Sequence, residues 1–128
     1  MSEVVLDASA LLALLNREPG HEEVARTIPR AAISAVNLSE VVAKLAEGGM
    51  PEEAIRDALE GLALEVHEFG RDLAYGTGLL RTATKSRGMS LGDRACVTLV
   101  QRLGLPVLTT DRAWEGLEVG VDVRLIRS

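Results

Sequence analysis

Short apolar runs that end in an aspartate constrain the fold of this chain more than any other feature. Val4-Val5-Leu6 is followed by Asp7, and the apolar residues 106–110 are followed by Asp111. Runs of this length are typical of buried strands. Stretches with helical periodicity lie between them, so strands and helices alternate along the chain. This alternation predicts an α/β fold, namely a three-layer α/β/α sandwich with a mainly parallel central sheet.

The other elements follow from periodicity and from residues that start or stop helices. Ser9 and Ser90 are the expected N-caps of two helices, and Pro51 is expected in the first turn of another, after the stop at Gly48-Gly49. These signals predict strands at residues 4–6, 31–34, 64–69, 106–110 and 121–126, and helices at residues 9–16, 21–28, 35–47, 51 onward, 71–86 and 90–103. No repeat or linker interrupts the pattern, so we expect one domain spanning residues 1–128.

Composition excludes several classes of protein. The single cysteine, Cys96, cannot form an internal disulfide or a cysteine-based zinc site, and its apolar helical neighbours predict a buried thiol. No apolar run approaches the roughly 20 residues that cross a bilayer. The start of the chain, Met1-Ser2-Glu3, lacks the basic region of a secretory signal. We therefore expect a cytoplasmic protein with no membrane partner.

The net charge of −5 conceals an asymmetry along the chain. Residues 1–70 contain five Lys or Arg against thirteen Asp or Glu, whereas residues 71–128 contain nine against six. Because phosphate contacts are local, a basic strip can bind nucleic acid on an acidic protein. The alternative is that these are ordinary solvated helix charges. The candidates for phosphate contacts are Arg81, Lys85, Arg87 and Arg94, which are close in sequence, and Arg112, which follows Asp111 as Arg94 follows Asp93.

Four carboxylates occupy positions suited to chemistry. Asp7 and Asp111 follow strands, and ligands bind outside the carboxyl ends of strands in an open parallel sheet. Asp93 lies in the first turn of a predicted helix, and Glu40 lies within another. Each has a simpler explanation, because Asp7 could cap a helix, Asp93 could complement a helix dipole, and Glu40 could be solvated. Spacing alone leaves both interpretations open.

Four segments resemble a known family when they are taken together and in order. They are Val-Val-Leu-Asp-Ala-Ser-Ala-Leu-Leu at 4–12, Ile-Ser-Ala-Val-Asn-Leu-Ser-Glu-Val at 33–41, Ser-Leu-Gly-Asp-Arg-Ala-Cys at 90–96 and Leu-Thr-Thr-Asp-Arg-Ala-Trp at 108–114. This series resembles the motifs of PIN-domain nucleases, and within that family it is most similar to VapC-type toxins of toxin–antitoxin pairs. The resemblance spans nearly the whole chain.

The resemblance implies that Asp7, Glu40, Asp93 and Asp111 converge on Mg²⁺, with Mn²⁺ as a substitute. Close carboxylates repel one another, and a divalent cation with a preference for oxygen ligands converts that repulsion into attraction. Asp7 and Asp93 are the first candidate ligands. Glu40 is then a ligand or a general base, and Asp111 supports a second metal or the outer shell. The matching polar residues, Ser9, Asn37 and Thr109, would orient the carboxylates or a water.

The same resemblance implies an endoribonuclease toxin that acts as a homodimer and is held inactive by a cognate antitoxin. Apolar helical residues, among them Leu11, Leu45 and Leu59, could form the surfaces that contact the second subunit or the antitoxin, or they could belong to the core. Two alternatives are a phosphoacceptor receiver-like domain and a catalytically silent PIN-fold binding module. Receiver domains need a pair of acids after the first strand and a late lysine, whereas Ala8-Ser9 follows Asp7 and no lysine follows Lys85.

Three further residues are candidates for ligand contacts but have simpler roles. His21 and His67 are isolated from the acidic motifs, which favours structural or surface roles. Trp114, the only tryptophan, could stack on a base, although packing beneath the loop is the favoured interpretation.

Overall fold

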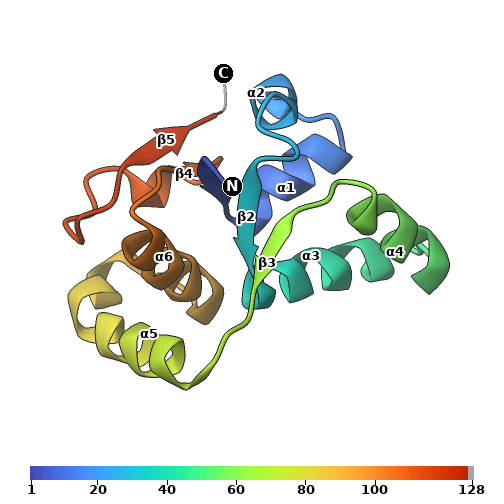
Figure 1. Cartoon of the computed structure of the whole chain (residues 1–128). Helices are drawn as coiled ribbons and strands as arrows, with labels where there is room; N and C mark the ends of the chain where they lie inside the picture. The colour runs from blue at the N-terminus through green and yellow to red at the C-terminus, as the bar shows by residue number, and fades with distance from the viewer. Residues whose placement is uncertain (127–128) are drawn as a thin grey trace.

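Five parallel strands form the central sheet in the computed structural model, which describes residues 1–126 (Figure 1). The strand order is β3-β2-β1-β4-β5, and every neighbouring pair is parallel. The predicted α/β class is confirmed, and the sheet is parallel throughout. The strands are β1 (Val4–Leu6), β2 (Ala31–Ser34), β3 (Glu65–His67), β4 (Val107–Thr109) and β5 (Val123–Leu125).

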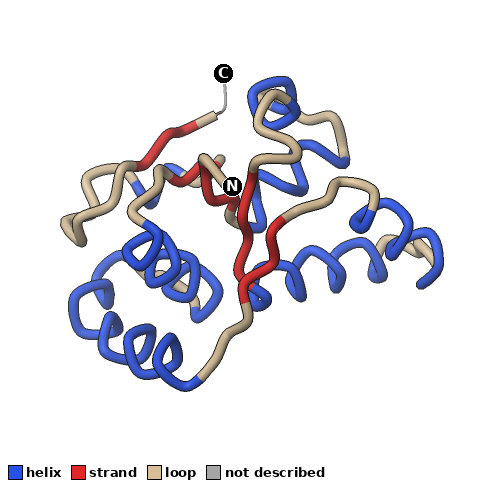
Figure 2. The backbone as a smooth tube through the Cα atoms, in the orientation of Figure 1, coloured by secondary structure: helices blue, strands red, loops and turns tan. Residues whose placement is uncertain are grey.

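Helices cover both faces of this sheet, and Figure 2 shows them in blue around the red strands. Helices α1 to α4 pack on one face, while α6 packs on the other with α5 beside it. Their bounds are α1 (Ala8–Leu15), α2 (His21–Ala25), α3 (Ala35–Glu47), α4 (Glu52–Glu60), α5 (Arg71–Thr84) and α6 (Leu91–Leu103). Two 3₁₀ helices complete the fold, η1 (Lys85–Arg87) and η2 (Arg112–Trp114).

Side chains on the central strands divide between two hydrophobic clusters. Val4 and Leu6 contribute to the cluster beneath α1, α3 and α4, whereas Val5 contributes to the cluster beneath α6. Successive side chains of a strand point to opposite faces, so each face of β1 is buried under helices. The edge strands β3 and β5 are more exposed. This arrangement is the predicted three-layer sandwich.

Several predicted boundaries differ from the structure. Asp7, and not Ser9, is the N-cap of α1, because its backbone is extended and its carboxylate accepts a hydrogen bond from the Ala10 amide. Pro51 is the N-cap before α4 and does not lie in its first turn. Helix α5 ends at Thr84, and the chain continues as η1. The predicted strands 64–69, 106–110 and 121–126 are each shorter in the structure.

The strand order creates one position, between β1 and β4, where the chain reverses the side of the sheet on which it adds strands. From β1 the chain crosses to β2 and β3 on one side, and β4 and β5 lie on the other. The carboxyl ends of β1 and β4 therefore border a topological switch point, where α/β folds bind ligands. Asp7 and Asp111 follow these two strands. Among residues 1–126 no helix is both long enough and apolar enough to span a membrane.

Candidate active site

Asp7 lies at the centre of a buried hydrogen-bond network. Its side chain is only 4% exposed. Oδ1 accepts hydrogen bonds from the Ser9 hydroxyl at 2.7 Å and the Ala10 amide at 2.9 Å, and Oδ2 accepts one from the Thr109 hydroxyl at 2.5 Å. Three donors thus fix both carboxylate oxygens. Ser9 also accepts a hydrogen bond from the Thr110 amide, so the start of α1 is tied to the chain after β4.

Burial raises the pKa of Asp7 from 3.8 to about 6. The hydrogen bonds from Thr109, Ser9 and Ala10 lower this pKa, and the charge of Asp93 raises it again. Loss of solvation outweighs the three donors because the carboxylate is almost completely removed from water. A cation beside this group would favour its ionised form.

Thr109 connects Asp7 to Asp111. The Asp111 amide donates to Thr109 Oγ1 at 3.0 Å, while that hydroxyl donates to Asp7. Asp111 in turn accepts a hydrogen bond from the Ala113 amide at 2.9 Å and caps η2. One threonine hydroxyl therefore links the carboxyl ends of the two strands at the switch point.

Glu40 reaches the site from α3. Its Oε1 accepts a 2.9 Å hydrogen bond from Nδ2 of Asn37, and the same nitrogen donates to the Gly92 carbonyl at 3.0 Å. The start of α3 therefore meets the start of α6 at the edge of the sheet. Sequence reasoning did not single out Gly92, although a glycine in the first turn of a helix beside a motif aspartate was an available signal.

Asp93 forms a capping box with Ser90. The Ser90 amide donates to Asp93 Oδ2 and the Asp93 amide donates to Ser90 Oγ, both at 3.1 Å. Asp7 therefore has the capping role considered for it, and Asp93 lies in the first turn of α6, where it complements the helix dipole and also completes a capping box. These roles are compatible with a ligand role, because both helices direct their positive ends toward the carboxylates.

The buried thiol of Cys96 reports on how the carboxylates are grouped. Burial raises its pKa, and the charges of Asp7, Asp93 and Glu40 raise it further. The charges of these three carboxylates thus all act on one buried group, and Thr109 joins Asp111 to Asp7. Within residues 1–126, no three His, Cys, Asp or Glu side chains already form a group that could hold a metal ion.

The donor set nevertheless suits a hard divalent cation. It consists of carboxylate and amide oxygens, which are the ligands that Mg²⁺ and Mn²⁺ prefer. Oδ1 of Asn37 is buried without a hydrogen-bond partner among the described residues, and Asp7 is buried within the field of Asp93. A cation beside either group would offset the cost of its burial.

The members of the predicted basic strip differ in whether their side chains donate hydrogen bonds to backbone carbonyls. Arg87 donates to the carbonyls of Glu115 at 2.6 Å and Gly116 at 3.0 Å, and thereby holds the loop after η2. Arg94 is partly buried and donates to the Thr77 carbonyl of α5. Arg81 and Lys85 are exposed. The exposed Arg112 lies 3.6 Å from Glu115.

The remaining candidate residues have structural surroundings. Trp114 and Cys96 are completely buried, which confirms the packing predicted for both and contradicts the base-stacking alternative for Trp114. His67 lies 3.1 Å from Glu65 on the edge strand β3, and the partly exposed His21 begins α2. Neither histidine belongs to the hydrogen-bond network of the carboxylates.

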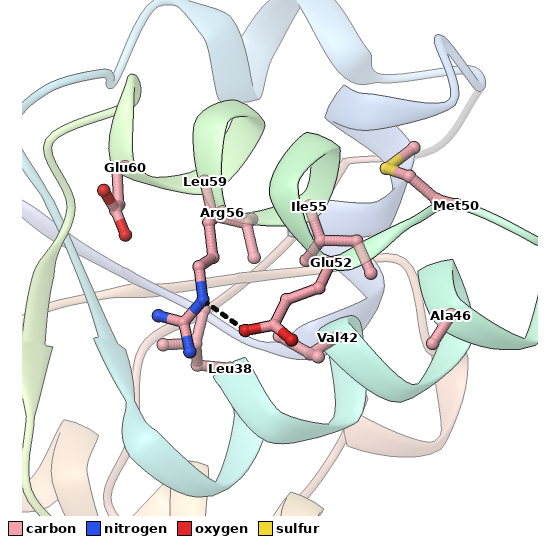
Figure 3. A pocket seen from close by; sticks show the side chains of 9 residues that line it. All are labelled: Leu38, Val42, Ala46, Met50, Glu52, Ile55, Arg56, Leu59 and Glu60. Carbon is pink, nitrogen blue, oxygen red and sulfur yellow. Dashed lines mark hydrogen bonds and ion pairs between the residues drawn. The ribbon is translucent and has the colours of Figure 1, made fainter.

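Two hollows lie along α3. An open one of about 620 Å³ borders Glu40 and Gly92 and is lined also by Val36, Phe69 and Leu91. A second, of about 450 Å³, lies between α3 and α4, with apolar walls and a Glu52–Arg56 ion pair at 2.8 Å (Figure 3). Leu11, Leu45 and Leu59 all belong to the core, and Leu59 also lines this second hollow. Of the two hollows, only the first borders a candidate carboxylate.

Comparisons with known proteins agree with the observed fold. A family model described as the PIN domain matches residues 4–119. No curated protein matches the chain. Three solved structures illustrate the likeness of fold. The DNA-bound VapBC complex of Salmonella typhimurium is 24% identical, with a TM-score of 0.74, over 97% of this chain and 98% of that one.

The other two structures are more distant in sequence. VapC20 of Mycobacterium tuberculosis, a toxin described as cleaving the sarcin–ricin loop, is 16% identical, with a TM-score of 0.75, over 98% of this chain and 100% of that one. A Pyrobaculum aerophilum protein, PAE2754, is 21% identical, with a TM-score of 0.64, over 95% and 83%. At these identities the likeness is one of fold.

Proposed function

Because this chain belongs to the PIN domain family, we propose that it is a Mg²⁺-dependent endoribonuclease that hydrolyses RNA phosphodiester bonds. One observation carries the proposal. Asp7 is buried at the switch point of the sheet, three donors fix its orientation, and the charge of Asp93 acts on it. A buried carboxylate in the field of another is costly without a cation, so the arrangement favours a site for a divalent metal.

We assign the four carboxylates to this metal site. Asp7 and Asp93 would hold the ion, Glu40 would be a further ligand or the general base, and Asp111 would support a second ion or the outer shell. Mg²⁺ or Mn²⁺, when bound, supplies the Lewis-acid chemistry of phosphodiester hydrolysis.

The polar neighbours act through the carboxylates. Ser9 and Thr109 hold both oxygens of Asp7, so that this ligand keeps one orientation. Asn37 holds Oε1 of Glu40. If Glu40 is the general base, its Oε2 is the atom to which we assign the proton of the attacking water.

The substrate contacts that we propose follow from exposure together with the hydrogen bonds that each basic side chain makes. Arg81, Lys85 and Arg112 are exposed, and we assign them to RNA phosphates. Arg87 and Arg94 donate to backbone carbonyls, so we assign them first to positioning the loop after η2 and the α5–α6 pair. The open hollow beside Glu40 offers room for substrate.

We further propose that the chain is the toxin of a type II toxin–antitoxin pair. Solved structures with this fold include toxin–antitoxin complexes from Salmonella typhimurium and Klebsiella pneumoniae. The proposal includes a single domain over residues 1–128, a homodimer, inhibition by a cognate antitoxin, and a cytoplasmic location. Membership of the PIN domain family leaves the receiver-like alternative without support.

Cleavage of RNA by the purified chain tests the enzymatic proposal. Wild type and Asp7→Asn are incubated with total RNA in Mg²⁺, in Mn²⁺ and in excess EDTA, with single-stranded DNA as a parallel substrate. We expect cleavage of RNA by the wild type in either metal, and none in EDTA or by the variant. Equal cleavage by both proteins, or cleavage in EDTA, would contradict the proposal. Metal-independent RNA binding without cleavage would support the silent binding module.

A further inference from the structure

The carboxylate of Glu40 lies where a side chain on Gly92 would have to be. A Cβ built on Gly92 would stand 2.5 Å from both Cδ and Oε1 of Glu40. A Cβ essentially never comes that close to an atom to which it is not bonded, so the backbone of α6 and the Glu40 carboxylate can take these positions together only where the residue is glycine. Gly92 is itself buried in the first turn of the helix.

Asn37 fixes this close approach from the other side. Nδ2 donates to Glu40 Oε1 and to the Gly92 carbonyl, and both partners are acceptors. A flipped amide would direct its oxygen at two other oxygens, so the observed orientation is the only one that satisfies them. The amide is 1% exposed and thus has little freedom to move.

The two other glycines within helices are less crowded than Gly92. A Cβ on Gly76 of α5 would meet Cγ2 of Thr98 at 3.1 Å. A Cβ on Gly78 of α5 would meet nothing within 4 Å. Glycine has a lower helix propensity than alanine, so Gly92 destabilises α6 slightly. Its missing side chain leaves the space that the Glu40 carboxylate occupies. Gly78 therefore provides a matched control for the same substitution.

We propose that Gly92 is a positioning residue for the metal site: by lacking a side chain it lets Asn37 hold the Glu40 carboxylate against the first turn of α6, beside Asp93. This inference rests on the proposed function. Asp93 is the next residue in the chain, and the charges of Glu40 and Asp93 both act on Cys96. Glu40 would then be held on the metal-facing side of α6 before any metal binds.

The substitution Gly92→Ala separates this role from folding. The atoms that a new methyl group would meet belong to the flexible end of Glu40, so the protein can relieve the contact by moving that carboxylate. The backbone can then stay in place. The expected damage is displacement of Glu40 and loss of its hydrogen bond from Asn37, in a chain that remains folded.

Mn²⁺ binding to four variants of the full chain tests the inference. Free Mn²⁺ is measured by electron paramagnetic resonance during titration of wild type, Gly92→Ala, Glu40→Gln, the double variant and Gly78→Ala. Changes beside a metal ligand cost about 10-fold to 100-fold in affinity. We expect Gly92→Ala and Glu40→Gln each to weaken binding at least tenfold, the double variant to match Glu40→Gln, and Gly78→Ala to match wild type.

This non-additivity is the decisive result, since a merely structural defect at Gly92 would add to the loss of Glu40. Wild-type affinity in Gly92→Ala, or a double variant weaker by the product of both losses, would overturn the inference. Circular dichroism melting is expected to show that Gly92→Ala remains folded.

A metal-free measurement separates this inference from the proposed function. The side-chain amide protons of Asn37 are followed by NMR in EDTA, where the lost hydrogen bond to Glu40 is expected to shift them in Gly92→Ala but not in Gly78→Ala. Unchanged amide shifts in Gly92→Ala would overturn the positioning role. If these shifts change but the wild type neither binds Mn²⁺ nor cleaves RNA, the positioning of Glu40 holds and the proposed nuclease function fails.

Discussion

Thr109 donates a 2.5 Å hydrogen bond to Asp7 across 102 residues of sequence. The bond joins the end of β4 to the end of β1, which are neighbours in the sheet. Because Thr109 also accepts a hydrogen bond from the Asp111 amide, one hydroxyl orients residues of two acidic motifs. Two of the four candidate carboxylates thus follow the central strands, and β4 supplies the hydroxyl group that links them.

Thr109→Val tests this alignment. Valine has nearly the same shape but cannot donate, so Asp7 loses a bond that lowers its pKa. We expect a further rise in the pKa of Asp7, measured by carboxyl NMR in metal-free protein, and a fall in kcat/KM for RNA cleavage of about 10-fold to 100-fold. Thr109→Ser retains the hydroxyl and is expected to restore most of the activity. Full activity in the valine variant would contradict the alignment.

The pH dependence of stability follows from Asp7. Its pKa is about 6 in the folded state and 3.8 ordinarily, so the folded state binds a proton more tightly. The stability associated with this group is fully present below about pH 4 and is lost as pH rises through 6. The loss is on the order of 3 kcal/mol. Urea unfolding in EDTA from pH 4 to pH 7 is expected to show this decline for wild type and a smaller one for Asp7→Asn.

Bound metal is expected to reverse which protein is the more stable, wild type or Asp7→Asn. In EDTA at pH 7, Asp7→Asn avoids the burial of a charge and is expected to melt above wild type. At about 100 times its dissociation constant, a metal ion stabilises the folded state by about 2.7 kcal/mol. Wild type should gain this stability in Mn²⁺ and the variant should not. Equal Mn²⁺-induced shifts in melting temperature would contradict the assignment of Asp7 as a ligand.

Alanine substitutions of Arg87 and Lys85 are expected to have different effects on stability and RNA binding, although the two residues are only two positions apart. Arg87 binds the carbonyls of Glu115 and Gly116, so Arg87→Ala should reduce the free energy of unfolding by about 1–2 kcal/mol. Lys85 is exposed, so Lys85→Ala should leave stability unchanged and weaken RNA binding. The slope of log affinity against log salt should then fall by about one. Chemical unfolding and RNA binding at several salt concentrations measure both effects.

Trp114 is expected to pack and not to stack on RNA. The side chain is fully buried, so acrylamide should quench its fluorescence only weakly. Added RNA should leave the emission unchanged, because a buried indole cannot reach a base. Trp114→Ala should cost about 3–5 kcal/mol of stability. Strong quenching by RNA would show instead that the loop after β4 opens to expose the ring.

Sequence patterns predict the strands and helices well because burial sets their periodicity. They also place Asp7 and Asp111 at strand ends. The cap of α1 is a different case, since both Asp7 and Ser9 are good caps and only the exact end of β1 decides between them. A pattern along the chain cannot distinguish the two.

Contacts between distant segments are harder to predict. Arg87 belongs to a basic run, but its partners lie 28 and 29 residues away in a loop, and no periodicity relates them. The role of Gly92 is equally hard to predict from the sequence, because it depends on Glu40, which approaches from another helix. The residues that carry charge are thus visible in the sequence, whereas those that orient the charges emerge from packing.

Manganese located in crystals tests the central claim most directly, because Mn²⁺ scatters anomalously and its position needs no functional assay. Crystals of the wild-type chain are soaked in Mn²⁺, and anomalous difference maps are calculated for wild type and for Asp7→Asn. We predict a peak bridging the carboxylates of Asp7 and Asp93 in the wild type and its loss in the variant. A peak elsewhere, with Asp7 and Asp93 unliganded in saturating Mn²⁺, would contradict the proposed metal centre.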